Sequence, residues 1–101
     1  MRVVVFFDLP VETSTERAEY RRFRKSLIKN GFVMMQQSVY TKIALNNTAA
    51  DVIKEVVRKN KPKTGLVQML VVTEKQFEKI EFVLGEGQKE FIDSADRLVI
   101  L

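Results

Sequence analysis

A single acidic residue, Asp8, ends the first apolar run of the chain. It follows residues 3–7, whose β-branched and aromatic composition is typical of a buried strand, and it precedes Leu9-Pro10, where proline cannot continue the strand. A carboxylate delivered to a rigid strand end suits a hard metal ion as ligand. Aspartate is also a favoured turn residue, so position alone leaves both a metal ligand and a structural turn open.

Cysteine and histidine are both missing from the sequence. Their absence excludes disulfides, zinc sites built from these residues, thiol nucleophiles and imidazole bases. Hydrolysis would have to use carboxylates with a metal, or a Lys, Tyr, Ser or Thr side chain. A metal-activated water is the usual solution for phosphodiesters.

The composition is that of a single soluble domain, with 101 residues, 46% of them apolar and 30% charged. No apolar stretch reaches the roughly 20 residues that a membrane span needs. Asp8 interrupts the first apolar run too early for a signal peptide. We therefore predict a cytoplasmic protein with no membrane association.

Positive charge is concentrated in the first two thirds of the chain. Residues 1–63 hold 13 Lys and Arg against 6 Asp and Glu, a net charge of +7, whereas residues 64–101 hold 4 against 7, a net charge of −3. Clustered cations release counterions when they meet phosphates, so this asymmetry favours a polyanion partner. A well-solvated helix face is the alternative explanation.

Six of these 13 cations fall on a predicted helix over 14–30. Thr13 and Glu16 fit a capping box, and Asn30-Gly31 is a typical helix end. One face of the helix is apolar and carries Tyr20, Phe23, Leu27 and Ile28. The candidate nucleic-acid-binding residues occupy the remainder and are Arg17, Arg21, Arg22, Arg24 and Lys25. Two stripes are possible at helical spacing, one made by Arg17, Arg21 and Arg24, the other by Arg22, Lys25 and Lys29.

Further strands are expected after this helix. Residues 32–43 are strand-like, with a polar break at 36–38 that indicates a bulge or a jog between two strand pieces. Residues 65–73 have the composition of a central strand, and 82–84 that of a short strand preceded by about one helical turn. The apolar end 98–101 is predicted to pair with a sheet edge, in its own subunit or, as we favour, in a partner.

A second helix is predicted between cap candidates at 46–48 and Lys61-Pro62. Its apolar stripe comprises Ala49, Val52, Ile53, Val56 and Val57. Its end is basic, through Arg58, Lys59, Lys61 and Lys63. Cations there offset the negative end of the helix dipole, and we prefer this structural explanation to a phosphate site.

The order of elements predicts an α+β, ferredoxin-like βαββαβ fold, with a four-stranded antiparallel sheet, two helices on one face and a short C-terminal strand. We assign residues 1–84 to this domain and residues 85–101 to a tail whose strand pairs at a dimer interface. The fold alone names no function. An RNA-recognition motif is set aside, because 65–73 contains no aromatic residue.

Three motifs carry a family resemblance: residues 3–9, the basic run 21–25, and 31–40, which holds Gln36-Gln37-Ser38-Val39-Tyr40. Together they resemble the CRISPR-associated Cas-two family over essentially the whole chain. Many members have Tyr before the strand-end Asp, where this chain has Phe7. The resemblance implies a homodimer that works with the Cas-one integrase in acquiring spacers, with a protospacer DNA duplex lying across it.

The resemblance also implies metal-dependent nuclease activity, with Asp8 of each subunit facing its twin to form one Mg²⁺ site, Mn²⁺ being an alternative ion. One carboxylate is a poor magnesium site, whereas two with waters and a phosphate oxygen complete an octahedral shell. Our hypothesis is that basic residues hold the nucleic acid through phosphates, with steep salt dependence. The alternatives are a purely architectural dimer that binds DNA and the integrase, a toxin-like endoribonuclease, and a regulatory small-molecule domain.

Overall fold

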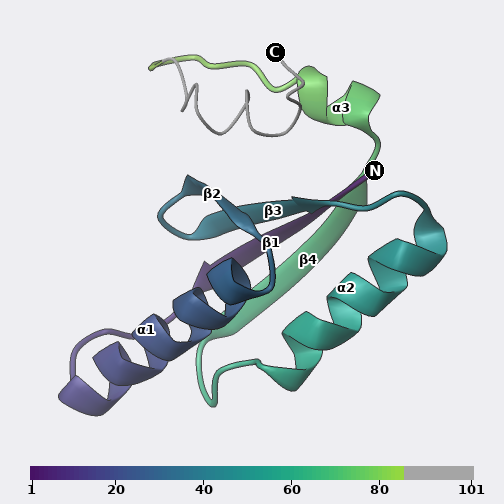
Figure 1. Ribbon diagram of the computed structural model, residues 1–101. Helices are drawn as coiled ribbons and strands as arrows, with labels where there is room; N and C mark the ends of the chain where they lie inside the picture. Colours follow the sequence, from purple (N-terminus) through teal and green to yellow (C-terminus); the bar gives the residue numbers. More distant parts are fainter. Residues whose placement is uncertain (86–101) are drawn as a thin grey trace.

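A four-stranded antiparallel sheet with two long helices on one face forms the body of the protein, in a computed structural model that describes residues 1–85 (Figure 1). The strands lie in the order β2-β3-β1-β4, which confirms the predicted ferredoxin-like α+β fold. The elements in chain order are β1 (Arg2–Asp8), α1 (Ser14–Lys29), β2 (Val33–Gln36), β3 (Val39–Ile43), α2 (Asn47–Lys59), β4 (Leu66–Val72) and the short α3 (Glu74–Glu78).

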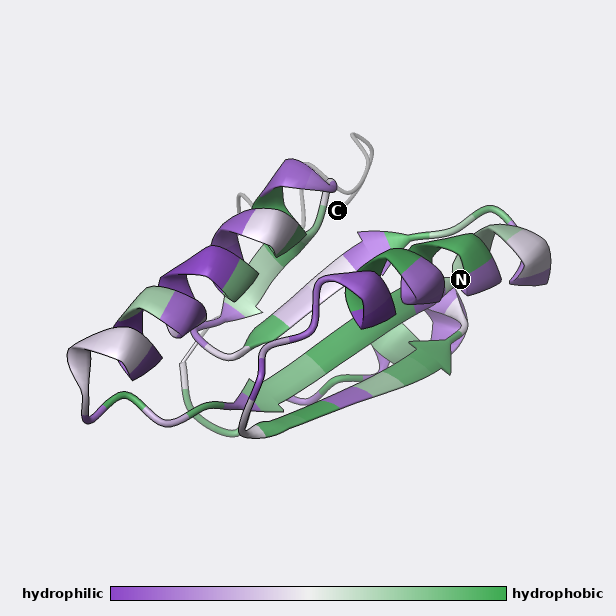
Figure 2. Cartoon of the chain, turned by 90° about the horizontal axis from the view of Figure 1, so that it is seen from below, coloured by the Kyte–Doolittle hydropathy of each residue, from purple (hydrophilic) through white to green (hydrophobic). Residues whose placement is uncertain are grey.

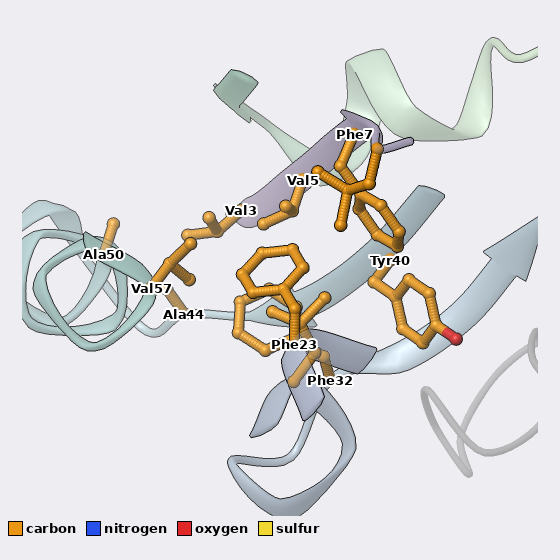
Figure 3. Close-up of a cluster of buried hydrophobic side chains, with 11 residues drawn as sticks. Val3, Val5, Phe7, Phe23, Phe32, Tyr40, Ala44, Ala50 and Val57 are labelled. Atoms are coloured by element: carbon orange, nitrogen blue, oxygen red, sulfur yellow. The ribbon is translucent and has the colours of Figure 1, made fainter. Parts of the chain in front are cut away.

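Strand β1 has two different faces, although its sequence is apolar almost throughout. Its odd-numbered residues are buried beneath the apolar sides of the helices (Figure 2). The ring of Phe7 lies at centroid distances of 5.9, 5.2 and 5.7 Å from the rings of Tyr20, Phe23 and Tyr40. Figure 3 shows the rings of Phe7, Phe23 and Tyr40. Since successive strand residues point to opposite faces, Asp8 lies on the face that α1 and α2 do not cover. We call it the helix-free face, and the short α3 contacts it at its other end, at Arg2.

The helix ends follow the sequence signals. Thr13 Oγ1 accepts a hydrogen bond from the Glu16 amide at 3.1 Å, and Glu16 Oε1 accepts one from the Thr13 amide at 3.0 Å, which completes the predicted capping box. Helix α1 ends at Lys29, with Asn30 as its C-cap. Asn46 caps α2 by accepting a hydrogen bond from the Ala49 amide at 2.8 Å.

The polar break at 36–38 is the turn of a hairpin that joins β2 to β3. The strand register also shifts between Met34 and Gln36, so the segment contains an irregularity as well as a reversal. The Ser38 carbonyl accepts a hydrogen bond from the Phe7 amide at 3.0 Å. The hairpin turn therefore lies at the same end of the sheet as Asp8.

The prediction of a central strand at 65–73 is wrong for residues 1–85, where β4 is an edge strand that pairs only with β1. Val67, Met69 and Val71 pack against the core, while Leu66 and Leu70 are each 54% exposed. A run that is apolar except for Gln68 indicates two largely apolar faces, but it does not show that both faces are covered.

The short strand predicted at 82–84 is also absent from the described structure. After α3 the chain continues without regular structure, and Val83 and Leu84 are almost fully exposed. The five residues of α3 form the expected helical turn, and they carry the chain off the end of β4 before it reaches this apolar segment (Figure 1). The predicted strand at 98–101 lies outside the described residues.

Two residues of the predicted helical stripes are exposed instead of buried. Ile28 of α1 is 49% exposed and Val52 of α2 is 62% exposed, because each lies at the margin of a stripe whose centre contacts the sheet. Phe23 and Leu27 of α1, and Val57 of α2, fill the core as expected. No helix within residues 1–85 has the length and hydropathy to cross a membrane.

Candidate functional site

Asp8 is the last residue of β1 and is exposed on the helix-free face, opposite Leu66 of β4. The chain turns immediately after it, and Leu9 is buried at 8% exposure, which anchors the turn. Within residues 1–85 the Asp8 side chain forms no hydrogen bond or ion pair. A rigid strand end therefore holds a carboxylate that has no structural partner in the described part of the chain.

The described residues do not form a metal site on their own, since they contain no group of three or more acidic side chains that could hold an ion. Glu12 is the next acidic residue along the chain. The following one, Glu16, already accepts hydrogen bonds from two amides at the start of α1, at 2.9 and 3.0 Å. Asp8 provides one hard oxygen donor group, so further ligands would have to come from waters, a phosphate or a second chain.

Three of the five predicted nucleic-acid-binding residues make polar contacts within the protein. Arg17 donates to two carbonyl oxygens of the preceding loop at 3.1 and 2.9 Å. Arg24 Nε donates to the Tyr40 hydroxyl at 2.8 Å. Arg22 is also engaged, at the junction of the two helices. Sequence spacing placed these cations on the helix surface, but it did not show which of them also have structural roles.

Arg21 and Lys25 differ from these three residues. Both are exposed, and neither side chain forms a hydrogen bond or an ion pair with another residue between 1 and 85. They are four residues apart, so they lie on the same side of α1. Their contact with nucleic acid stays a prediction, and they are the members of the predicted set with the fewest internal constraints.

Arg22 joins α1 to the end of α2. Its Nε lies 2.8 Å from Glu19 Oε1, and its Nη2 donates to the carbonyl oxygens of Asn60 and Lys61 at 3.1 and 3.2 Å. Hydrogen bonding from Arg22 is the main cause that lowers the pKa of Glu19, and the same bond raises the pKa of Arg22. No local sequence signal predicts this contact, because Asn60 and Lys61 lie 38 and 39 residues beyond Arg22 in the chain.

Apolar side chains remain exposed on the helix-free face that carries Asp8. The strand registers place Phe6, Val33, Ile43, Leu66 and Leu70 on this face, with exposures between 36% and 54%. We call these five residues the open sheet patch. Exposed apolar residues collected on one face are typical of an interaction surface.

A pocket of about 320 Å³ lies on the other side, between α1 and the hairpin, and is lined by Tyr20, Arg24, Met34 and Gln37. The Tyr20 hydroxyl donates to the Gln37 carbonyl at 3.3 Å across it. Within the described residues, the Arg24 side chain donates one hydrogen bond, from Nε to the Tyr40 hydroxyl. The N–H groups on its two Nη atoms can therefore donate to an anion.

Comparison with known proteins places these features in context. The family model described as CRISPR associated protein Cas2 matches residues 1–80. A Treponema denticola protein named CRISPR-associated endoribonuclease Cas2 is 54% identical over 101 residues, covering 100% of both chains. A Ligilactobacillus salivarius protein of the same name is 48% identical over 101 residues, again covering 100% of both.

Among solved structures, Streptococcus pyogenes Cas2 at pH 6.5 superposes with a TM-score of 0.62 at 23% identity, over 84% of this chain and 100% of that one. At this identity the structural likeness supports the fold.

Proposed function

The chain belongs to the Cas2 family of CRISPR-associated proteins, and from this membership we propose that it acts as a homodimer in spacer acquisition. In this proposal the dimer binds duplex DNA, bridges the Cas-one integrase and hydrolyses phosphodiesters with Asp8 of each subunit. The observation that carries the proposal is the exposed Asp8 carboxylate at the end of β1, without a partner among the described residues and on the same face as the open sheet patch.

The open sheet patch supports a dimer that brings two Asp8 side chains together. A second copy that packs on this patch covers apolar surface that one chain leaves exposed. Because Asp8 lies on the patch's own face and at its end, a two-fold axis that passes near this end would bring the two carboxylates together. The interface and the metal site are therefore predicted to depend on each other.

Two carboxylates with waters and a phosphate oxygen fit the preference of Mg²⁺, or of Mn²⁺, for hard oxygen ligands. When bound, the ion would supply charge stabilisation to the phosphodiester and a more acidic water. The chain's own cations have the complementary task of positioning the nucleic acid. Arg21 and Lys25 are free for phosphate contacts among the described residues, and Arg24 keeps donors toward the pocket beside the hairpin.

Substitution of Asp8 tests the catalytic part. Wild-type protein, Asp8→Asn and the matched control Glu12→Gln are titrated with labelled duplex DNA and with RNA of the same sequence, with Mg²⁺, with Mn²⁺ and with chelator, and binding and cleavage are measured in the same samples. We expect Asp8→Asn to bind normally but to lose cleavage by at least about 100-fold, while Glu12→Gln cleaves as the wild type does. Equal cleavage by wild type and Asp8→Asn would exclude the proposed catalytic role.

Two related functions are alternative outcomes of this experiment. Binding of duplex DNA with no metal-dependent cleavage identifies a purely architectural dimer. Cleavage of RNA but not DNA identifies an endoribonuclease, the activity named for the relatives from Treponema denticola and Ligilactobacillus salivarius.

Charge introduced into the open sheet patch tests the dimer. We expect Leu70→Asp to weaken self-association by about 30-fold or more, because it places a carboxylate in an apolar contact. Val52→Asp on α2 is the control, since Val52 is 62% exposed and lies outside the patch. Light scattering across a concentration series reports the mass of each variant. A Leu70→Asp protein that stays dimeric would place the interface elsewhere.

A further inference from the structure

We propose that Lys59, Lys61 and Lys63, at the connection from α2 to β4, form a phosphate-binding surface for a nucleic acid duplex beside Asp8. We call these three residues the lysine ledge. The inference deepens the proposed function and rests on it for the role of Asp8, while the binding surface itself stands on the contacts that follow.

The connection is fixed against the middle of α1. Arg22 Nη2 donates to the carbonyl oxygens of Asn60 and Lys61 at 3.1 and 3.2 Å. Glu19 Oε2 accepts a hydrogen bond from the backbone amide of Lys63 at 3.1 Å. Three backbone groups of a short loop are thus bound to two side chains of one helix. The lysine side chains project from a positioned backbone, and ordering them on a ligand costs correspondingly less conformational entropy.

The usual structural role for cations at a helix end is already filled. Arg22 caps carbonyl oxygens at the end of α2, and the Asn60 side-chain amide donates to the Val56 carbonyl at 2.8 Å. Arg58 pairs with Glu55 at 2.9 Å. The helix end is therefore capped and neutralised without the lysine ledge.

The three ledge side chains are exposed, and their ammonium groups form no hydrogen bond or ion pair with any residue in the described range 1–85. Lys63 helps to lower the pKa of Glu19, but only after Arg22, which is the dominant cause. Three cations within residues 59–63 raise the local positive potential, which a bound polyanion neutralises. Their arrangement is thus explained better by an external anion than by the stability of the chain.

The loop that carries the ledge passes directly beside Asp8. Gly65 has φ +98°, and a Cβ at this position would lie 2.9 Å from the Asp8 carbonyl oxygen and 2.6 Å from Leu9 Cδ2. Leu66 then pairs with Asp8 in the sheet. Only glycine permits this close approach. The ledge and the candidate metal ligand therefore lie at the same end of the sheet, the lower end in Figure 1.

The chemistry of the ledge favours a duplex over a single strand. Proteins that hold single strands usually stack bases on aromatic side chains, and residues 59–66 contain none. Lysines without aromatic neighbours recognise the regular phosphates of a duplex, through counterion release and without base readout. Arg21 and Lys25 are exposed cations on α1, the helix whose Arg22 binds this connection. The expected ligand is the phosphodiester backbone of a duplex.

The test compares Lys61→Glu/Lys63→Glu with the control Lys75→Glu/Lys79→Glu, which makes the same change of charge at α3. Full-length proteins are titrated with labelled duplex DNA, duplex RNA and single-stranded RNA over a series of salt concentrations. We expect the ledge variant to bind a duplex at least about 10-fold more weakly at low salt, with the slope of log K against log salt reduced by about 2. The control should stay within about twofold of wild type.

An unchanged affinity and salt slope in the ledge variant would overturn the proposal, as would a loss confined to single-stranded RNA. If binding to duplex DNA and to duplex RNA weakens equally, the ledge recognises phosphates in either duplex. If binding to one duplex alone weakens, that duplex is the ligand of the ledge. Lys61→Gln/Lys63→Gln is the neutral variant, and its melting curve shows whether it folds. When folded, it should lose less duplex affinity than the Glu variant.

The ledge and the proposed catalysis can fail separately. If the ledge variant binds weakly while Asp8→Asn cleaves like the wild type, the ledge stands and the hydrolytic role of Asp8 falls. If Asp8→Asn loses cleavage while the ledge variant binds normally, the catalytic proposal stands and the ledge is rejected.

Discussion

The two ends of strand β1 carry opposite charges on the sheet face that α1 and α2 do not cover, and only the Arg2 end is contacted by the short helix α3 among the described residues. Arg2 at the first end is 6% exposed; its Nε lies 3.0 Å from Glu74 Oε2 and its guanidinium lies 4.1 Å from the centre of the Phe77 ring. Asp8 at the other end is exposed and makes no side-chain contact of this kind within residues 1–85. A charge that is buried and paired stabilises the fold, whereas a charge held rigidly without a partner is available for a ligand.

Removing the paired charge should therefore cost far more stability than removing the free one. We expect Arg2→Met to lower the free energy of unfolding by about 2–3 kcal/mol, because Glu74 loses its cation and Phe77 its contact. This loss of unfolding free energy is smaller than for a fully buried ion pair, because the Glu74 side chain is 41% exposed. Asp8→Asn should change stability by less than about 0.5 kcal/mol. Urea unfolding measures both variants.

A double-mutant cycle sharpens this comparison. Glu74→Gln and the Arg2→Met/Glu74→Gln double variant isolate the coupling between the two side chains. If Asp8→Asn destabilises the protein as much as Arg2→Met does, then Asp8 is a structural turn residue and the contrast between the two ends is lost.

Gly65 allows the second test, because it sets the close packing at the Asp8 end. Gly65→Ala should cost about 1–2 kcal/mol through strain at φ +98° and contact with Asp8 and Leu9. Gly31→Ala is the comparison variant with φ +90°, where the nearest atoms belong to the end of Lys42, whose Nζ donates to the Asn30 carbonyl at 2.6 Å. The difference between the two variants in thermal unfolding compares backbone contact at Gly65 with side-chain contact at Gly31. Equal losses would mean that only backbone conformation matters at Gly65.

These contrasts also show what could be predicted from the sequence. The boundaries of α1 were predictable because Thr13 and Glu16 make contacts three residues apart, and the end position of Asp8 followed from Pro10. Signals of this kind can be read from the sequence, because the residues that interact are close together in the chain. The edge position of β4 was not predictable, because the apolar composition of a strand does not show which of its faces is covered.

The cations were the hardest part to interpret. Helical spacing grouped Arg17, Arg21 and Arg24 in one stripe of α1. It did not show that Arg17 contacts a loop and Arg24 a tyrosine on a strand, while Arg21 makes no such contact within residues 1–85. The dipole role predicted for the cations at the end of α2 stays a prediction, and the sequence does not show that Arg22 also donates to carbonyl oxygens there. Contacts between residues far apart in the chain decide which charges are free, and one sequence does not reveal them.

Neighbouring arginines on α1 repeat the comparison on a smaller scale. Arg22→Ala should lower the free energy of unfolding by about 1 kcal/mol, since it uncaps the end of α2 and leaves Glu19 without its main partner. Arg21→Ala should leave stability unchanged and weaken duplex binding by several-fold. Unfolding and binding measured on both variants separate the two roles. An Arg21→Ala protein that loses stability would show an internal contact for that side chain.

The pH dependence of the Glu19–Arg22 contact is the smallest effect, and its sign follows from the shift. Hydrogen bonding from Arg22 lowers the pKa of Glu19 in the folded protein below its ordinary value of 4.5. The contact therefore stabilises the protein fully above about pH 4.5, and this stabilisation disappears as the pH falls through the lowered pKa. Arg22 stays charged throughout, so Glu19 is the partner that titrates.

Glu19→Gln should accordingly be less stable than the wild type at neutral pH and converge with it in acid. In the Arg22→Ala background the same substitution should produce almost no pH-dependent difference, because the cause of the shift is gone. Added salt should reduce the difference, since the pair is exposed. A difference that grows toward acid pH would mean that Glu19 is held in its protonated form, and the junction that positions the lysine ledge would then need another source of rigidity.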